Sequence, residues 1–248
     1  MKAHLLLILS GCFSFSANAQ DATEIIRKAD NKFQGEKSSI STITMIVKRP
    51  KWERTIVFKT WISGRDYALT LIIEPAKEKG QSFLKVKNEM WNWNPSISRM
   101  IKLPPSMLSQ GWMGSDYTNN DLLRESSLVN DYTHRIIGTE TTGGTLCWKI
   151  ELLPKEASTV VRGKIIKWIS KEGFDQLRTE YYDEEGVLMR TEIASDIKSM
   201  NNRLIPTRFE IIPADKPGNQ TIVILNEIRF NVPIPGSFFT QQNMKQVK

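Results

Sequence analysis

The stretch TIVFKTWISGRDYALTLII, residues 55–73, decides the fold class, because its apolar side chains recur at every second position on both sides of a turn. The alternation runs through residues 56–62, stops at the turn-forming residues 63–66, and resumes through residues 67–73. A period of two is typical of a β-strand with one buried face, whereas a helix repeats its apolar positions about every 3.6 residues. The stretch therefore predicts two neighbouring strands joined by a short turn.

The same period extends over most of the chain. It recurs between residues 42 and 103 and again between residues 135 and 230, interrupted by short segments rich in Gly, Asp, Asn and Pro. Only one helical stripe precedes the strands, formed by Ile25, Ile26 and Ala29. About ten to twelve strands joined mostly by short turns predict a mainly β fold, a meandering antiparallel sheet that is curled or closed.

Residues 104–121 interrupt the strand pattern. Their prolines and glycines exclude a regular element, yet the segment carries several large apolar side chains. A loop of this length and composition is more often a lid or a binding loop than a plain connector. We expect Asp116 to brace it through backbone hydrogen bonds, as Asp does in turns. The apolar side chains of this loop are Met107, Leu108, Trp112, Met113 and Tyr117.

The chemistry of an enzyme is not visible in the sequence. Apart from the first 19 residues, the chain has one histidine, His134, and one cysteine, Cys147, which cannot supply a catalytic triad or a metal site. Asp116 and Asp121 could act as a carboxylate pair, but turn and helix-cap roles are the commoner use of such residues. We predict no enzymatic activity, no cofactor and no metal, and we expect Cys147 to be buried and unreactive.

Residues 1–19 are predicted to be a signal peptide. A positive start precedes an apolar run at residues 5–9, and residues 17–19 form a small-x-small cleavage site. Cleavage after Ala19 would place the mature protein in the periplasm. The alternative is a lipoprotein anchored at Cys12, which ends a lipobox-like segment. Export also argues against nucleic acid as a partner, although the sequence pI is about 9.3.

Several motifs together resemble those of the outer-membrane lipoprotein-sorting group of the LolA-like superfamily. The runs are MWNWNP (90–95), RMIKLP (99–104) and MGSDYTNNDL (113–122), followed later by RLIPTRF (203–209) and FFT (238–240). In that group, a strand ending in aromatic residues leads to a basic strand and then to a Gly-Ser/Thr-Asp-aromatic loop. The middle motif is the most specific of these, and the resemblance covers nearly the whole chain after the signal peptide.

The resemblance implies an incomplete β-barrel of about eleven strands, with short helices as a lid over a hydrophobic cavity. Residues 20–248 would then form a single LolA-like lipid-binding domain. The classical carrier of the superfamily uses an arginine of its sheet to take its cargo. That arginine is not identified here, and Arg54, Arg65 and Arg99 are all candidates by position.

The expected ligand site combines one face of the strands with the loop. We expect the loop motif Gly114, Ser115 and Asp116 to shape the lid, and apolar side chains to line the cavity. Seven tryptophans and nine methionines in the chain are sufficient for such a lining. The expected lining residues are Tyr67, Leu69, Leu71, Ile73, Val86, Met90, Trp112, Met113, Tyr117, Trp148 and Ile150.

Two functions fit this site. The first is a periplasmic carrier or chaperone that binds lipid or the acyl chains of lipoproteins, for transport to or across the envelope. The second is a lipid-sensing or accessory subunit of an envelope complex, such as an exporter of the resistance-nodulation-division type. Under either function, the expected partners besides the lipid or acyl chains are an inner-membrane exporter or an outer-membrane acceptor. The two readings differ in whether the lipid is moved or sensed.

Overall fold

The strands form one open sheet. The predicted signal peptide, its cleavage site after Ala19 and the alternative anchor at Cys12 lie outside the residues that the structure describes. Within the described residues, thirteen strands lie in one sheet in the order β6-β5-β4-β3-β2-β1-β13-β12-β11-β10-β9-β8-β7. The structure is a computed structural model that describes residues 21–34, 37–123, 127–156 and 163–248.

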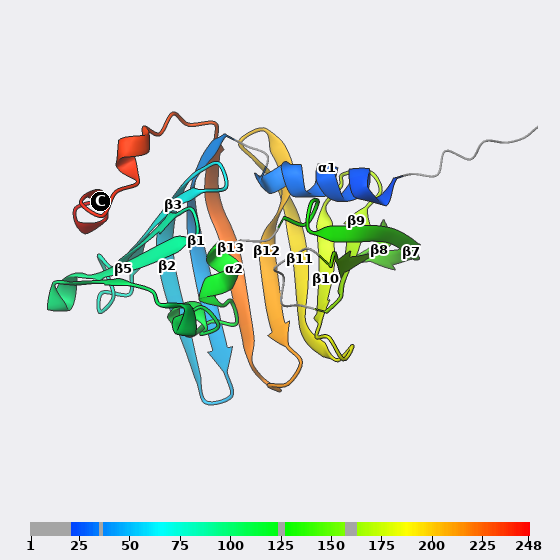
Figure 1. The fold of residues 1–248 in the computed structure, drawn as a ribbon, viewed down its shortest axis with the longest axis horizontal. Coiled ribbons are helices and arrows are strands. Elements are labelled where there is room, and N and C mark those ends of the chain that lie inside the picture. Colours follow the sequence, from blue (N-terminus) through cyan, green and yellow to red (C-terminus); the bar gives the residue numbers. More distant parts are fainter. Residues whose placement is uncertain (1–20, 35–36, 124–126, 157–162) are drawn as a thin grey trace, which may run out of the picture.

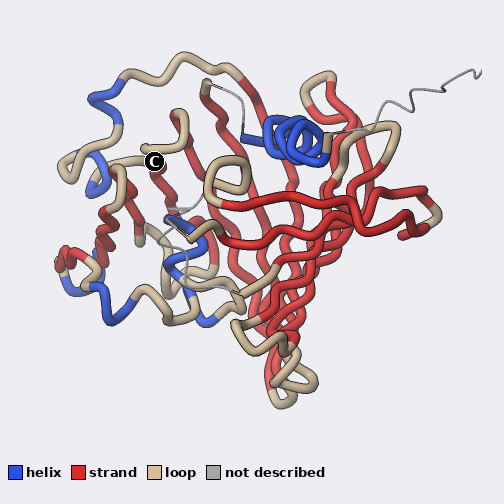
Figure 2. Tube along the Cα trace, turned by 45° about the vertical axis from the view of Figure 1, so that its right-hand side comes forward, coloured by secondary structure: helices blue, strands red, loops and turns tan. Residues whose placement is uncertain are grey.

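The pairing is antiparallel throughout this sheet, and strands β6 and β7 are its two edges. The sheet curls but does not close (Figure 1, Figure 2). The predicted fold class, a curled antiparallel sheet or incomplete barrel, is confirmed. The strands are β1 Ser38–Arg49, β2 Trp52–Ser63, β3 Tyr67–Glu74, β4 Ser82–Val86, β5 Glu89–Asn94, β6 Arg99–Lys102, β7 Tyr132–Thr142, β8 Thr145–Pro154, β9 Ile165–Ser170, β10 Gln176–Tyr182, β11 Leu188–Met200, β12 Arg203–Pro213 and β13 Gln220–Phe230.

The strand number exceeds the expected eleven partly because one predicted strand is a hairpin. The apolar residues from Phe83 to Trp93 predict a single long strand, but β4 and β5 pair with each other across a tight turn. Lys87 in this turn has a φ of 52°, in the left-handed region. Residues other than glycine rarely adopt this backbone conformation. The sequence does not indicate the turn, because the apolar alternation continues on both sides of it.

The helices are short and lie on the faces of the sheet. None of those in the described ranges is long and apolar enough to cross a membrane. Figure 1 shows α1 lying across one end of the sheet. The helices are α1 Ala22–Gln34 and α2 Asn119–Leu123, with 3-10 turns η1 Pro95–Ile97, η2 Pro105–Met107, η3 Trp112–Gly114, η4 Gly236–Phe238 and η5 Asn243–Lys245.

Two separate apolar layers cover the concave face. At the β7–β10 side, α1 packs on the sheet, where Ile25, Ile26 and Ala29 of the predicted stripe contact Trp148 and Ile150. At the β1–β5 side, residues 104–123, which we call the plug, supply Trp112 and Leu123 to a second cluster. The cavity lies between these two layers.

The convex face has an apolar layer of its own at the β2–β4 part of the sheet. The chain after β13, which we call the C-terminal segment (residues 231–248), runs beside β3 (Figure 1). Its side chains Phe239 and Met244 form a cluster with Trp61, Leu69 and Leu71 of β2 and β3. The β2–β4 part of the sheet therefore has an apolar layer on each face, which the alternation alone does not distinguish.

Candidate functional site: a cavity beneath the plug

A cavity of about 690 Å³ lies on the concave face, between the sheet, the plug and α1. This is the size of a typical small-molecule site. Strands β1–β5, β7 and β9–β13 contribute to its wall, so the cavity exists only when both halves of the sheet are joined. The apolar part of the wall includes Ile43, Met45, Phe58, Phe83, Met90, Trp112, Leu122, Phe209, Val223 and Leu225.

The plug is fixed to the sheet by Asp116. Arg49 Nη1 on β1 lies 3.0 Å from Asp116 Oδ2, and Arg49 Nη2 donates to the Gly114 carbonyl at 2.7 Å. On β13, Thr221 Oγ1 donates to the same carboxylate oxygen at 2.7 Å and accepts from the Asp116 N–H at 2.9 Å. Asp116 therefore braces the plug, but not through the backbone hydrogen bonds that were expected. Its carboxylate binds two side chains of the sheet, Arg49 and Thr221, and its own N–H donates to Thr221.

The other residues of the loop motif shape the turn. Met113 and Gly114 have φ values of 52° and 79°, so two successive residues are left-handed. Such a turn favours glycine at Gly114, which has no Cβ to clash. Ser115 is buried, and its Oγ accepts from the Tyr117 N–H at 3.2 Å. The motif therefore folds the plug and presents Trp112 and Tyr117 to the cavity.

Trp112 is a core residue of the plug as well as a wall of the cavity. Its side chain is only 4% exposed. Its ring meets Phe58 edge-on at 5.2 Å between centroids and Phe83 at 5.3 Å. Within the described residues its Nε1 is buried without a hydrogen-bond acceptor. The contacts fix Trp112 against β2 and β4, so it is packed into the structure rather than resting over an open mouth.

A buried arginine joins the plug to β11. Arg190 Nη1 lies 2.9 Å from Asp121 Oδ2, and Nη2 lies 3.0 Å from Glu192 Oε1. The guanidinium also lies over the rings of Tyr181 at 4.5 Å and Tyr117 at 5.7 Å. Burial opposes the charge, but Glu192 and Asp121 outweigh it and raise the pKa of Arg190, so the residue stays cationic.

Asp121 and Tyr117 complete this contact. Asp121 accepts from the Thr118 N–H at 2.9 Å, and the Asp121 N–H donates to Thr118 Oγ1 at 3.1 Å, which is a capping box at the start of α2. Burial raises the pKa of the Tyr117 hydroxyl well above its usual value, with Glu192 adding to the effect. Asp116 and Asp121 thus have the brace and cap roles that the sequence favoured.

The candidate arginines are now distinguishable by position. Arg65 lines the cavity and pairs with the buried Asp30 of α1. Arg54 instead pairs with Glu78 at 3.0 Å, and Arg99 is exposed on the edge strand β6. Arg190, which the sequence analysis did not consider, also lines the cavity. In the sequence, Arg190, Glu192 and Ala194 alternate along one strand and so share a face, but this pattern does not show that the face is buried.

Four of the predicted lining residues border the cavity, namely Tyr67, Met90, Trp112 and Tyr117. Tyr67 does so only at the rim, because its ring packs on the convex face, 5.6 Å from the ring of Phe239. Met113 packs against the plug cluster without bordering the cavity. Trp148 and Ile150 are on the concave face but lie under α1, outside the cavity wall.

The prediction that the face of Leu69 and Leu71 looks into the cavity is wrong. Both side chains are on the convex face, in the cluster with Phe239 of the C-terminal segment. Val86 belongs to that convex cluster too. Ile73 lies beside a register shift between β2 and β3 and does not border the cavity. On β3 the face toward the cavity is that of the intervening residues, Ala68 and Thr70, with Tyr67 at the rim.

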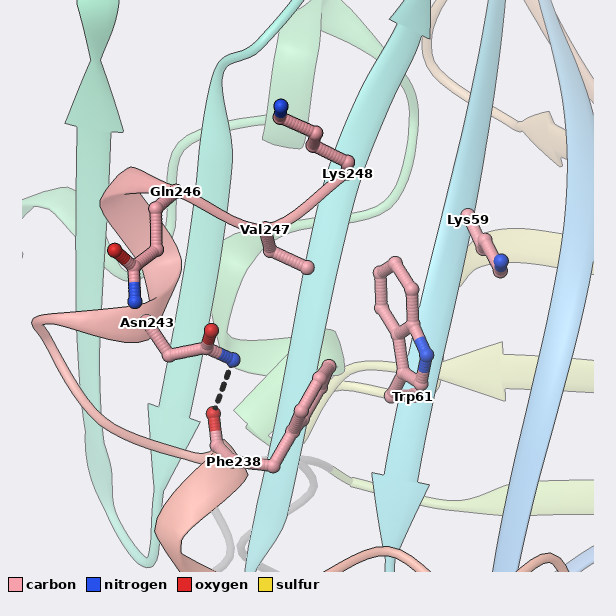
Figure 3. Close-up of a pocket in the computed structure, with 7 residues that line it drawn as sticks. All are labelled: Lys59, Trp61, Phe238, Asn243, Gln246, Val247 and Lys248. Carbon is pink, nitrogen blue, oxygen red and sulfur yellow. Dashed lines mark hydrogen bonds between the residues drawn. The ribbon is translucent and has the colours of Figure 1, made fainter.

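The convex face carries a second, shallower hollow of about 650 Å³, between β2 and the C-terminal segment. Figure 3 shows Phe238 beside Trp61, with the rings 5.4 Å apart, and Asn243 Nδ2 donating to the Phe238 carbonyl at 2.8 Å. Lys59 and Lys248 flank it. The hollow is open and is flanked by charged side chains, so it is a less suitable place than the cavity for an apolar ligand.

The histidine and the cysteine considered in the sequence analysis both have partners in the fold. His134 Nε2 contacts the Leu128 carbonyl at 2.7 Å and Nδ1 contacts Thr23 Oγ1 at 3.1 Å. Cys147 is fully buried, as predicted, among Trp168, Ile166 and Leu177. In the described ranges no three His, Cys, Asp or Glu side chains gather in a way that could hold a metal ion.

Solved structures with this architecture come from several bacteria. A DUF1329 family protein from Desulfovibrio piger aligns with a TM-score of 0.80 and 22% identity, over 90% of this chain and 97% of that one. An outer membrane lipoprotein-sorting protein domain from Vibrio parahaemolyticus gives a TM-score of 0.77 and 21% identity, over 91% and 98%. A LolA superfamily protein from Nitrosomonas europaea gives 0.74 and 24%, over 90% and 99%.

These likenesses establish the fold, since each alignment covers nearly the whole of both chains. Because the sequence identity is low, they establish the fold alone. The fold that the resemblance to the LolA-like superfamily implied is thereby confirmed. A separate comparison with the curated proteins found no match. A family model with the description "Uncharacterized protein" matches residues 64–246, more than half of the chain. The chain therefore belongs to the family that this model describes, and it has the fold of the LolA superfamily.

Proposed function

We propose that the protein is a non-enzymatic carrier that holds a lipid, or the acyl chains of a lipoprotein, in the cavity beneath the plug. The observation that carries this proposal is the apolar part of the cavity wall. Phe58, Phe83, Met90 and Trp112 surround one end of a space of about 690 Å³. A free acyl chain gains about 0.8 kcal/mol for each CH₂ that leaves water for a membrane, so a carrier needs a comparable lining.

The proposal extends to the place of action. The predicted signal peptide leads to the periplasm, and residues 20–248 act there as one lipid-binding domain. The Vibrio parahaemolyticus structure with the same fold is described as an outer membrane lipoprotein-sorting protein domain, which is compatible with such a role. The acceptor in this proposal is the outer membrane or an exporter of the inner membrane.

The experiment is a test of occupancy. Protein purified from the envelope without detergent is analysed by native mass spectrometry, and the expected result is bound lipid that is released on unfolding. The protein freed of lipid should then bind a fluorescent fatty acid. Absence of both lipid and probe binding in a folded protein contradicts the carrier proposal.

A pair of variants on β11 locates the binding. Ala194 lines the cavity and pairs with Phe209, whereas its neighbour Ser195 pairs with Arg208 on the opposite face. Ala194→Trp places a large side chain in the cavity and should abolish probe binding. Ser195→Trp adds the same bulk on the convex face and should leave binding unchanged. Equal binding by both variants would exclude the cavity as the site.

A second candidate, lipid sensing within an envelope complex, is favoured by the way the plug is held. Two ion pairs of largely buried side chains, Arg49 with Asp116 and Arg190 with Asp121, fix it to opposite halves of the sheet. A ligand that enters beneath the plug would act on both halves at once. Recovery of a stable complex from envelope extracts, present only when the cavity is loaded, separates sensing from transport.

A further inference from the structure

The end of the molecule at β6 has an exposed apolar surface that does not belong to the cavity. We call residues 95–103 the tip, which consists of η1, the edge strand β6 and the residue after it. Two of its apolar side chains are exposed, Ile97 at 63% and Ile101 at 39%, and Met107 of the adjoining plug is 36% exposed. Figure 1 shows the tip, in green, at the opposite extremity of the molecule from β7. Exposed apolar side chains that are grouped on one protruding segment are typical of an interaction surface.

The tip lies in a part of the molecule that lacks acidic side chains. Residues 90–115 and residues 231–248 contain no Asp or Glu, although 27 of the 248 residues of the chain are acidic. At that frequency the two stretches together would carry about five acidic residues. They are far apart in the sequence but pack together, since Trp93 and Met100 share a cluster with Phe239. The lack of acidic residues is therefore a property of one surface region.

Basic side chains surround this region. Arg99 and Lys102 lie on β6, and both are exposed. The turn between β3 and β4 carries the exposed Lys79. This turn abuts η1, because a Cβ on Gly80 would lie 3.3 Å from a side-chain atom of Pro95. The exposed apolar residues of the tip thus have basic residues on both sides.

Two tryptophans beside the tip each have a lysine over the ring. Lys102 Nζ lies 5.6 Å from the ring centre of Trp91, and Lys245 Nζ of the C-terminal segment lies 5.4 Å from that of Trp93. Both rings are half-buried on the convex face. Lys102 also pairs with Glu89, but an exposed pair of this kind contributes little. Tryptophan next to Lys or Arg is typical of the membrane interface, where the ring lies at the level of the head groups and the cation meets lipid phosphate.

From this combination we propose that the tip docks on the surface of a membrane that contains anionic phospholipid. Arg99, Lys102 and Lys79 contact the lipid phosphates, and Ile97 and Ile101 insert among the head groups. The occupant follows from complementarity, because the surface is basic around its edge and apolar at its centre, and a bilayer offers negative charge above an apolar interior. This docking goes beyond the carrier proposal and does not depend on it.

Docking at the tip would bring the plug side of the cavity to the bilayer. The chain passes from β6 directly into the plug, and the Leu103 N–H donates to the Met90 carbonyl at 2.8 Å. Met90 itself borders the cavity. The surface that meets the membrane is therefore joined to the cavity wall by consecutive residues and by one backbone hydrogen bond.

The test is flotation with lipid vesicles. The purified protein is mixed with vesicles of phosphatidylcholine alone, or of phosphatidylcholine and phosphatidylglycerol. We expect at least about fivefold tighter binding to the anionic vesicles, because each basic residue near such a surface contributes about that factor. Added salt should weaken this binding. A lipid molecule that the cavity extracts leaves the protein in solution, so cavity binding alone does not produce flotation.

Two pairs of exposed variants locate the surface. Ile97→Ser should weaken vesicle binding about tenfold, whereas Leu204→Ser on β12, at a similar exposure of 64%, should leave it unchanged. Lys102→Gln should weaken binding to the anionic vesicles about fivefold. Its control is Arg135→Gln on β7, the opposite edge strand, where Arg135 likewise pairs with a glutamate of the neighbouring strand. This control should bind as the unmodified protein does.

Each contrary outcome overturns a defined part of the proposal. Equal binding to the two kinds of vesicle overturns the anionic partner, and absence of flotation of the unmodified protein overturns docking altogether. Equal losses in a variant and its control overturn the position of the surface. A dimer in solution that Ile97→Ser dissociates assigns the surface to a second copy of the chain and also overturns the proposal. None of these outcomes decides whether the cavity holds a lipid.

Discussion

Arg49 and Asp116 are 67 positions apart in the sequence and 3.0 Å apart in the structure, where they join β1 to the plug. Both side chains are largely buried, at 13% and 7% exposed. A pair in such a position contributes to stability mainly because neither charge can be left alone without a penalty. The plug is consequently a fixed part of the wall, and its position depends on this contact.

The first prediction concerns that contact. Asp116→Ala leaves Arg49 without its carboxylate and Thr221 without its acceptor, so the free energy of unfolding should fall by about 3–5 kcal/mol. Urea denaturation measures it. The control is Glu53→Ala, whose pair with Lys48 is exposed and 3.8 Å long. It should change stability by less than about 1 kcal/mol. Similar losses in both variants would show that the brace is unimportant.

Trp112 should behave as a core residue. Trp112→Ala removes the edge-on contacts with Phe58 and Phe83 and should lower the free energy of unfolding by about 3–5 kcal/mol. Affinity for an acyl probe should fall as well, because the same ring borders the cavity. Trp112→Phe should cost less, since it keeps an aromatic ring and removes the buried N–H. An early-melting Trp112→Ala that binds the probe normally when folded would restrict the plug to a structural role.

Leu71 provides a test of which face of β3 borders the cavity. It is buried at 8% exposed beneath the C-terminal segment, on the side away from the cavity. Leu71→Ala should lower the free energy of unfolding by about 2–5 kcal/mol and leave the affinity of the folded protein for an acyl probe unchanged. The comparison variant is Thr70→Val, one position away and facing the cavity. A loss of affinity in Leu71→Ala greater than in Thr70→Val would contradict the assignment of faces.

The Cys147 thiol should react slowly. Its side chain is buried, and burial raises the pKa of the thiol, so the reactive thiolate is scarce at neutral pH. A thiol reagent added to the native protein should label Cys147 far more slowly than it labels the same protein in denaturant. Rapid labelling under native conditions would mean that the β8–β10 region opens frequently.

His134 should make stability depend on pH below neutrality. Burial lowers its pKa in the folded state, whereas the unfolded value is near 6.5. The unfolded chain therefore takes up the proton first. The contribution of neutral His134 is fully present above about pH 6.5 and is lost as the pH falls toward the folded pKa. Relative to His134→Gln, the stability advantage of the unmodified protein should shrink between pH 7.5 and pH 5. A constant difference would contradict this.

The sequence predicted the strands better than it predicted their faces. A period of two places Tyr67, Leu69 and Leu71 on one side of β3, and this is what the structure has. It cannot tell which side is concave, because the C-terminal segment makes the convex side of β2–β4 apolar too. That segment is more than 150 residues from β3 in the sequence, so no local pattern indicates the contact.

The plug of the candidate site could be predicted from the sequence, whereas the buried charged residues of the cavity could not. Prolines and glycines between large apolar residues identified the plug, and its Asp116 was expected to brace it. Arg190 and Glu192 were not identified, since alternating charges on a strand usually mark a solvated face. Their burial arises from the plug lying over β11, a tertiary contact that only the folded chain reveals. The hairpin at Lys87 was missed for a related reason, because it preserves the alternation.

The order of the strands has a consequence for the folding of the molecule. The middle of the sheet is the pairing of β1 with β13, so the first strand in sequence order pairs with the last one. Each half can build its hairpins locally, but the two halves join across almost the whole chain, a non-local step that is slow in β proteins. Until β1 and β13 pair there is no enclosed cavity, and each half-sheet exposes an additional edge strand.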